Sequence, residues 1–270
     1  MEHYTALGPY LKRRFGCKVY KLSLSAGCTC PNRDGTLGAH GCIFCSGSGE
    51  FAASGSASIP EQLEQAKYIL GKKAQGAKFI AYFQDFTNTY GAVSRLEPLF
   101  LAAMEPDDVV ALSIATRPDC LPEDILRMLS RLRARKPVFV ELGLQTIHEA
   151  TAHYIRRGYP LSVFDDAVQK LHALEIEVIA HQILGLPGET AEMMAETTRH
   201  LGSVHVDGVK LHLLHVLRGT DLAREYADGR IQTLELDTYI DILEQCLAVL
   251  PPKVVIHRLT GDGAKRDLIA

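Results

Sequence analysis

Four of the seven cysteines in this sequence crowd into an 18-residue stretch, which is the strongest chemical signal in the chain. They are Cys28, Cys30, Cys42 and Cys45, and the last three form the pattern C-x11-C-x2-C. A structural zinc ion usually takes four ligands from two C-x2-C half-sites, and a C-x-C pair is a poorer half-site. An iron–sulfur cube held by three cysteines instead leaves one iron open to another molecule. The pattern favours such a cluster over zinc, and both over inert core cysteines.

Composition limits the other possibilities. The 270 residues include 29 Lys and Arg against 32 Asp and Glu, a net charge of −3, and 47% of them are hydrophobic. This balance argues against a protein that coats nucleic acid by charge alone. No run of about 18 uncharged apolar residues is present, so we expect no membrane span. The N-terminus is charged where a secretion signal would be apolar, so we expect a cytoplasmic protein with reduced cysteines.

Apolar runs of strand length alternate with helical patterns along most of the chain, which is typical of a parallel α/β protein. No Pro-rich or Ser-rich linker divides the sequence, so we expect a single domain over residues 1–270. Its expected parts are an N-terminal helix at about 4–15, a core barrel at about 19–215, and a C-terminal helix and strand within about 220–270. The predicted strands are 19–25, 78–84, 109–116, 138–145, 177–184 and 208–214, followed by a helix at 234–250 and a strand at 254–257.

Period-two alternation places polar side chains on one face of most predicted strands. Glu141 and Gln145 share such a face, as do Lys210 and His212, while the opposite faces are apolar. A closed eight-strand barrel fills its interior with branched apolar side chains. Six strands with a polar interior therefore predict the α/β class and a partial (β/α)6 TIM-like barrel. The long loop after the first strand, 26–58, bears the clustered cysteines at the end of the barrel where such folds place their chemistry.

Eight segments of the sequence carry a resemblance to a known family. In chain order they are KLSLSAGCTCPNRDGTLGAHGCIFC, AYFQDFTNTY, LSIATRPDCL, ELGLQT, RRG, ILGLPGE, VKLHLLHVLRGT and RLTGDG. The sequence resembles the YhcC/YtqA-like family of the radical SAM superfamily, close to its elongator-type branch. The resemblance implies a [4Fe-4S] cluster with Cys30, Cys42 and Cys45 as ligands, although the first gap is longer than the superfamily's usual one. Cys28 stands where an apolar or aromatic residue is expected, so we leave it out of the ligand set.

The same resemblance implies that S-adenosylmethionine binds at the open iron. Phe44 would lie beside its adenine, and Gln84 with its neighbours would replace a glycine-rich turn that this sequence lacks. For Arg157 a surface ion pair is the competing interpretation, and alternation leaves open whether His181 or Gln182 points inward. The implied cofactor contacts are Phe44, Gln84, Thr87, Asn88, Gln145, Arg157, His181, Gly185 and Leu186.

Candidate catalytic or substrate residues end three of the predicted strands. Their Arg and Lys side chains fit an anionic group such as an RNA phosphate or a carboxylate. The competing interpretation is a set of structural ion pairs with Glu141 or Asp119. The candidates are Ser113, Thr116, Arg117, Lys210, His212 and Arg258.

The resemblance implies a radical SAM enzyme that reductively cleaves S-adenosylmethionine to a 5′-deoxyadenosyl radical and modifies the side chain of a tRNA wobble uridine. Its expected partners are tRNA and a reducing electron donor, with neither a membrane nor DNA. A second hypothesis keeps the radical chemistry and changes the substrate to a small metabolite or a protein side chain. A third is a non-catalytic RNA-binding module stabilised by zinc, which a protein containing zinc without iron would support.

Overall fold

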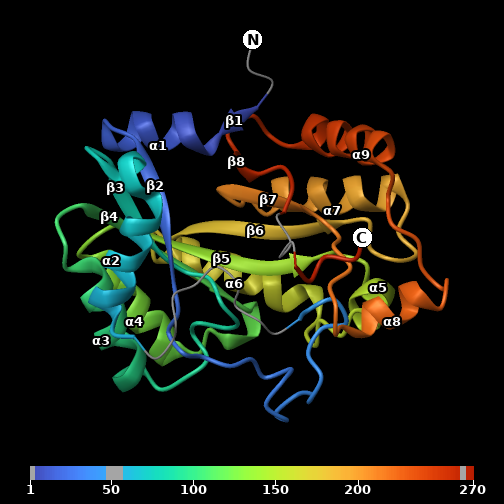
Figure 1. The fold of residues 1–270 in the computed structure, drawn as a ribbon, viewed down its shortest axis with the longest axis horizontal. Coiled ribbons are helices and arrows are strands. Elements are labelled where there is room, and N and C mark those ends of the chain that lie inside the picture. The colour runs from blue at the N-terminus through green and yellow to red at the C-terminus, as the bar shows by residue number, and fades with distance from the viewer. Residues whose placement is uncertain (1–3, 47–56, 262–265) are drawn as a thin grey trace.

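Eight parallel strands form one curved sheet, which is the framework of the molecule (Figure 1). The computed structural model describes residues 4–46, 57–261 and 266–270. The strands lie in the order β1-β8-β7-β6-β5-β4-β3-β2, so β1 and β2 are the two edges and the fold is an α/β half-barrel. Their bounds are β1 Thr5–Ala6, β2 Val19–Leu24, β3 Lys78–Phe83, β4 Val109–Thr116, β5 Val138–Gln145, β6 Glu177–Leu184, β7 Gly208–Leu213 and β8 Val255–Arg258.

The six-strand core predicted from the sequence is confirmed as β2 to β7. Strands β4, β5 and β6 have the predicted bounds, and β2, β3 and β7 each end one residue earlier than predicted. The edge strand β1 is absent from the prediction, because two residues are too few to show an alternating pattern. It pairs with β8 through Thr5↔Val255 and Ala6↔Ile256, and the first helix therefore begins only at Leu7.

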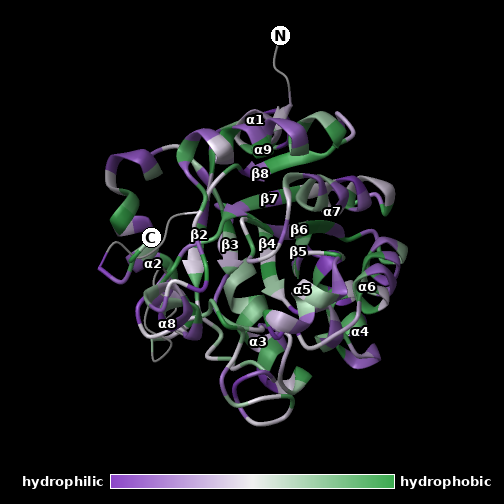
Figure 2. Ribbon diagram, turned by 90° about the vertical axis from the view of Figure 1, so that its right-hand side faces the viewer, coloured by the Kyte–Doolittle hydropathy of each residue, from purple (hydrophilic) through white to green (hydrophobic). Residues whose placement is uncertain are grey.

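Helices connect the strands and cover the outer face of the sheet (Figure 1). Helix α2 starts with a capping box, in which the side chains of Ser58 and Glu61 each accept a hydrogen bond from the other residue's backbone N–H. Figure 2 shows that helices α6 and α7 each carry both hydrophobic and hydrophilic residues. Within the described ranges, no helix has the length and apolar character needed to cross a bilayer. The α-helices are α1 Leu7–Phe15, α2 Ile59–Leu70, α3 Val93–Met104, α4 Glu123–Arg133, α5 Glu149–Tyr154, α6 Leu161–Ala173, α7 Ala191–Ser203, α8 Asp221–Ala227 and α9 Leu236–Val249, and the 3-10 helices are η1 Gly71–Ala74 and η2 Pro118–Cys120.

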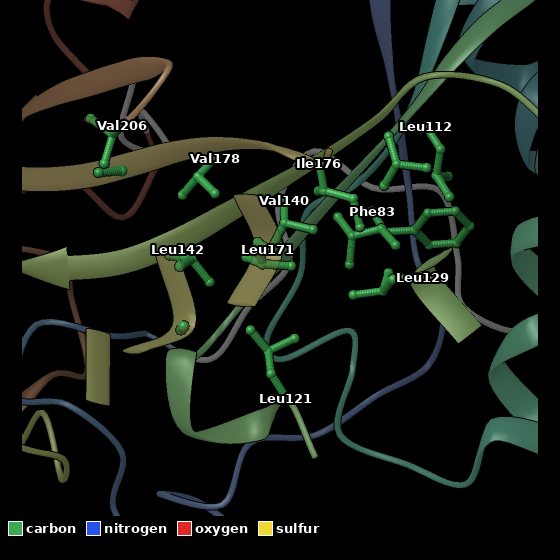
Figure 3. Packing of buried hydrophobic residues seen from close by; sticks show 14 of the residues in the cluster. Phe83, Leu112, Leu121, Leu129, Val140, Leu142, Leu171, Ile176, Val178 and Val206 are labelled. Carbon is green, nitrogen blue, oxygen red and sulfur yellow. The ribbon is translucent and has the colours of Figure 1, made fainter. Parts of the chain in front are cut away.

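The main hydrophobic core lies between the outer face of the sheet and these helices. Figure 3 shows part of it, with Phe83, Leu112 and Val140 from three neighbouring strands close to Leu129 of α4 and Leu171 of α6. All five side chains are fully buried. Burial of each contributes about 1.5–3 kcal/mol of stability. Because this core holds the outward side chains, alternate residues of every strand face the interior of the half-barrel.

Helix α1 closes the amino-terminal end of that interior. Its Leu11 packs with Ile80, Ala111, Phe139 and Ile179 in a separate buried cluster. These four residues come from the neighbouring strands β3, β4, β5 and β6 and lie on the inner face of the sheet. The interior is therefore apolar at this end, and polar side chains occupy the half nearer the carboxyl ends of the strands.

Candidate active site

The cysteine-bearing loop after β2 is tied to the loops at the carboxyl ends of other strands. The Ile43 N–H donates to the Ile155 carbonyl (3.3 Å), and the Ile43 carbonyl accepts from the Leu222 N–H (3.0 Å). Nearer β2, the Thr87 N–H donates to the Thr29 carbonyl (3.3 Å). In Figure 1 this loop, coloured blue, passes near α5 and α8. The cysteines therefore lie at the end of the half-barrel where this class of fold places its chemistry.

Cys30, Cys42 and Cys45 form one electrostatic group. Burial and, after it, the negative charges of Cys45 and Cys30 raise the pKa of Cys42 to about 11. A turn brings two of them close, because the Cys45 N–H donates to the Cys42 carbonyl (3.0 Å). Thiols with a raised pKa stay protonated at neutral pH unless a metal displaces the proton. Cys42 is therefore poorly suited to act as a free nucleophile.

Asn32 connects this group to the turn after α5. Its side-chain N–H group donates to Cys42 Sγ (3.6 Å) and to the Arg156 carbonyl (2.7 Å). Gly158 in that turn has a φ of +84°, and a Cβ at this position would lie 2.9 Å from Asn32 Oδ1. The RRG segment therefore needs glycine both for its left-handed backbone and for the close approach of Asn32.

Arg117, a predicted substrate residue, lies in the same region. Its guanidinium donates to both carboxylate oxygens of Asp119 (2.9 and 2.7 Å) and lies 5.1 Å from the centroid of the Tyr159 ring. Its positive charge opposes the rise in the pKa of Cys42. The ion pair with Asp119 is the competing interpretation given for this residue above, and it describes these contacts. Arg117 thus acts as a positive neighbour of the thiols.

Cys28 has different surroundings from the other three clustered cysteines. The Arg95 side chain donates to Cys28 Sγ (3.0 Å) and to the Ala26 carbonyl (2.8 Å). Burial raises the pKa of Cys28, and Arg95 opposes that rise. None of the causes of its shift is another cysteine. Cys28 therefore remains outside the proposed ligand set.

Three thiols in one loop fit a cluster that three cysteines hold and that leaves one iron open. Across the ranges that the structure describes, no group of three or more His, Cys, Asp or Glu side chains is placed to hold a metal ion. Thiolates on one zinc ion lie about 4 Å apart, because each Zn–S bond is about 2.3 Å long. An iron–sulfur cube is larger and holds its thiolates further apart. Cys30, Cys42 and Cys45 are the residues that would hold it.

Two proposed cofactor contacts meet on an apolar wall beside the cysteines. Phe44 packs against a buried cluster that includes Ile43, Leu186 and Leu214. Gly185, which precedes Leu186, has a φ of +89° and so gives the turn after β6 a conformation that favours glycine. An aromatic ring beside apolar side chains and a glycine turn is suited to hold a flat base such as adenine.

Gln84 follows β3 and Gln145 ends β5, and both side chains are partly exposed. Ser23 Oγ donates to Gln84 Oε1 (3.4 Å). Gln145 has a φ of +69°, and a Cβ on Gly143 would lie 2.9 Å from its Nε2 atom. Left-handed backbone at a non-glycine residue costs of order 1–3 kcal/mol and is concentrated at functional sites. Gln145 therefore has a left-handed, strained backbone at the opening of the half-barrel.

Thr87 and Asn88 are buried in the loop after β3. The Asn88 side-chain N–H group donates to the carbonyls of Phe83 (3.1 Å) and Ala115 (2.9 Å). The buried Asn88 Oδ1 has no hydrogen-bond partner among the described residues. An unsatisfied buried acceptor costs about 1–3 kcal/mol. A donor such as the amino group of S-adenosylmethionine would satisfy it, so this residue fits the proposed cofactor.

Arg157 holds the turn after β5 and does not present a free guanidinium. The residue is 2% exposed. Its side chain donates to the carbonyls of Thr146 (2.5 Å) and Tyr159 (2.9 Å), and it pairs with Glu149 (3.0 Å). The guanidinium is buried among backbone carbonyls, and its carboxylate partner Glu149 has an exposed side chain. Arg157 positions the RRG segment that Asn32 contacts.

The polar interior of the half-barrel is organised around Glu141, whose side chain is fully buried. Its Oε1 accepts from Lys21 Nζ (2.5 Å) and Ser113 Oγ (2.7 Å). Its Oε2 pairs with His181 Nε2 (2.8 Å) and with Lys210 Nζ. The two ammonium groups hold the pKa of Glu141 well below its usual value, although burial alone would raise it. His181, not Gln182, therefore points inward, which answers the question left open by alternation.

His212 and Arg258 border this network, while Thr116 does not. The His181 and His212 rings lie with their centroids 5.2 Å apart. Arg258 is exposed at the end of β8, where it pairs in register with Lys210. Thr116 lies on the other face of β4, with its Oγ1 atom 2.6 Å from that of Thr89. Thr116 is the one substrate candidate that the structure places away from the interior and the cysteines.

The sequence patterns predicted the polar side chains of the interior, but not the residues that support the cysteine loop. Alternation in β2 and β5 places Lys21 and Glu141 on the inner face, and both are there. Asn32 and Tyr159 are absent from the predictions. Asn32 contacts Cys42 and Tyr159 contacts Arg117, and only the fold brings the members of each pair together. The one available signal for Asn32 is its position two residues after Cys30.

This fold and site define a class of protein. Residues 35–201 match the family model described as the Radical SAM superfamily, and residues 206–270 match the model described as the Radical_SAM C-terminal domain. The chain belongs to the radical SAM superfamily and is an enzyme. Within it, the chain is 43% identical over 264 residues to the uncharacterized protein YtqA of Bacillus subtilis, a match that covers 97% of this chain and 82% of that protein. The YhcC/YtqA-like membership expected above is thereby confirmed.

Relatives of the elongator type are more distant. The chain is 28% identical over 156 residues to a protein of Methanocaldococcus jannaschii named tRNA uridine(34) acetyltransferase, covering 57% of this chain and 28% of that protein. Among solved structures, the Elp3 of Methanocaldococcus infernus matches with a TM-score of 0.72 at 20% identity, covering 93% of this chain and 58% of that chain. The structural match confirms the half-barrel fold. Family membership implies a [4Fe-4S] cluster and S-adenosylmethionine as cofactors.

Proposed function

We propose that this enzyme modifies the side chain of a wobble uridine in tRNA, with Cys30, Cys42 and Cys45 as the ligands of its cluster. The observation that carries the proposal is the group of three coupled thiols at the opening of a half-barrel with a polar interior. A closed set of four ligands would leave no open position for a cofactor. Three thiols beside an interior lined with hydrogen-bonding groups provide both the open position and a place for a substrate.

The chain's own residues would bind S-adenosylmethionine and orient it. When bound, the cluster and S-adenosylmethionine supply the reductive cleavage that yields a 5′-deoxyadenosyl radical. Phe44 and Leu186 would hold the adenine, and Asn88 Oδ1 would accept from the amino group of the methionine part. Gln145 would face the ribose. The apolar cluster around Leu11 excludes water from the far end of the interior.

The tRNA substrate is supported by two features. A relative of this chain is named for its action on uridine 34 of tRNA. The described residues also place exposed Arg258 beside the buried Lys210 of the neighbouring strand, where Arg258 would face a phosphate. Because the net charge is −3, RNA binding would depend on such local cations.

The test is a turnover assay on anaerobically reconstituted enzyme with a chemical reductant. We expect release of 5′-deoxyadenosine to rise when bulk tRNA is added, to fall steeply with salt, and to be accompanied by a new modified nucleoside in the digested tRNA. Ribosomal RNA at equal mass is the control and should not raise the release. Stimulation by a small metabolite or a peptide, with none by tRNA, would replace the proposed substrate. A zinc protein that lacks iron would contradict the proposal altogether.

A further inference from the structure

The buried charges in the half-barrel do not balance. Two ammonium groups, those of Lys21 and Lys210, face the single carboxylate of Glu141. In the part of the chain that the structure describes, neither lysine has a second carboxylate partner. Asp85, whose charge contributes to the raised pKa of Tyr82, has its own pKa raised by desolvation, with no cation among the causes. Among the described residues, the interior therefore holds two lysine side chains against one carboxylate.

Tyr82 lessens this imbalance without removing it. Lys210 Nζ donates to its hydroxyl oxygen (2.9 Å), and the ammonium groups of Lys210 and Lys21 lie 4.5 and 4.7 Å from the centroid of its ring. The face of an aromatic ring carries partial negative charge, which attracts cations. The hydroxyl and the ring are neutral, however, and cannot supply the missing negative charge. Burial together with the charge of Lys21 lowers the pKa of Lys210 to about 7, although Glu141 raises it.

The glutamate has no capacity left for the surplus charge. A carboxylate offers about four lone-pair positions. Lys21, Ser113, His181 and Lys210 use all four positions of Glu141. A further anion that enters the interior could therefore pair with the ammonium groups while Glu141 keeps its own contacts.

The neighbouring histidines supply unused hydrogen-bonding groups. His212 Nε2 and His257 Nδ1 are buried, and neither has a partner among the described residues. Burial and then the adjacent charges lower the pKa of both rings well below the usual value, so both are neutral at physiological pH. A neutral imidazole has one N–H donor, which a ligand oxygen would satisfy.

We propose that this interior is the subsite for an oxyanion of the substrate, a carboxylate or a phosphate, bound by Lys210 and Lys21 with His212 as a neutral donor. Arg258 at the opening would attract the anion toward the subsite. The inference rests on the proposed function, because it assigns substrate chemistry to the same half-barrel. It adds that the substrate, or a second small substrate, carries a compact negative group into the barrel.

Because the charge of Lys210 changes with pH, anion binding at the subsite should change with pH as well. The histidines facing it are neutral above about pH 6, since the pKa of His181 is lowered to about 4 by burial and by Lys210. Tyr82 stays protonated, because its pKa is raised well above the usual value by burial. Lys210 therefore controls anion binding between about pH 6 and about pH 9. Among the described residues, the charged and titratable groups near the subsite are Lys21, Tyr82, Asp85, Glu141, His181, Lys210, His212, His215, His257 and Arg258.

The experiment measures the thermal midpoint of the full, reconstituted chain in sodium acetate, sodium phosphate or sodium chloride at equal ionic strength. At about pH 6 we expect acetate or phosphate to raise the midpoint above that in chloride by about 2 °C or more, and the rise to shrink at about pH 9. The Lys210→Met variant should lose the rise. The Lys210→Arg variant should keep it at both pH values, because arginine stays charged. Lys72→Met, at an exposed position away from the interior, is the matched control and should behave like the wild type.

The different salts and ligands identify the bound anion, and the Lys210 variants test whether the subsite exists. A rise with acetate alone assigns a small carboxylate, whereas a rise with phosphate and with uridine 5′-monophosphate, but not with uridine, assigns a nucleotide phosphate. Equal midpoints in all three salts at about pH 6, or a rise that Lys210→Met retains, would overturn the subsite. This measurement needs no turnover. A wild type that releases no 5′-deoxyadenosine with any RNA would count against the proposed function alone.

Discussion

The Asn32 amide holds the sulfur of Cys42 and the turn after α5 at the same time. Hydrogen bonds to the sulfurs are one of the factors that set the reduction potential of an iron–sulfur cluster. A donor to a thiolate sulfur stabilises the reduced, more negative form. Asn32 is therefore placed to make the proposed cluster easier to reduce.

Replacing Asn32 by Ala removes that donor, and we expect the midpoint potential of the reconstituted cluster to become more negative. Potentiometric titration followed by electron paramagnetic resonance measures this shift independently of turnover. Thr36→Val is the matched control, because it removes a bond of the same loop to the Tyr90 hydroxyl (2.9 Å) without touching a sulfur. An unchanged potential in Asn32→Ala, or an equal shift in the control, would show that the amide only shapes the loop.

Among elements, helix α1 has a clear role that its sequence only partly reveals. Its apolar residues predict an amphipathic helix, yet nothing in the sequence says that this helix caps the interior of the half-barrel. Leu11 is the buried residue of α1 and contacts inner-face residues of four strands. The helix therefore determines how deep the polar interior extends.

Truncation of Leu11 to Ala should destabilise the fold by about 2–5 kcal/mol, because it opens a cavity in a packed cluster. Urea unfolding followed by circular dichroism measures the free energy of unfolding. Leu236→Ala, at a position that is 70% exposed, is the control and should change this free energy by less than about 0.5 kcal/mol. If both variants lost the same small amount, α1 would not be the cap described above.

Other elements follow from local patterns in the sequence to different degrees. Strands β4 to β6 are predicted to the residue, because long apolar and alternating runs state both the strand and its inner face. The two-residue β1 is not, since its only support is pairing with β8. The turn after β5 is likewise hidden: Arg157 is charged and near a motif, but its burial among carbonyls depends on a backbone path that the sequence does not state.

For the whole molecule, alternating polarity together with six strand-and-helix repeats was sufficient to predict a partial barrel with a polar interior. The cysteine spacing with that fold predicts which end carries the chemistry. The ion network could not be predicted in the same way. Lys21, Glu141 and Lys210 are distant in sequence, and their meeting around one carboxylate depends on strand register and on the curvature of the sheet.

The proposed function rests on the claim that three thiols from one loop hold an iron–sulfur cluster whose open iron accepts a cofactor. The most direct measurement is the iron and acid-labile sulfide content of anaerobically reconstituted protein, with spectra recorded before and after addition of S-adenosylmethionine. We predict about four irons per chain, a spectral change on addition of the cofactor, loss of both in the Ser variants of Cys30, Cys42 and Cys45, and retention of both in Cys17→Ser and Cys28→Ser. Stoichiometric zinc without iron, or loss of the metal in Cys28→Ser to the same extent, would contradict the claim.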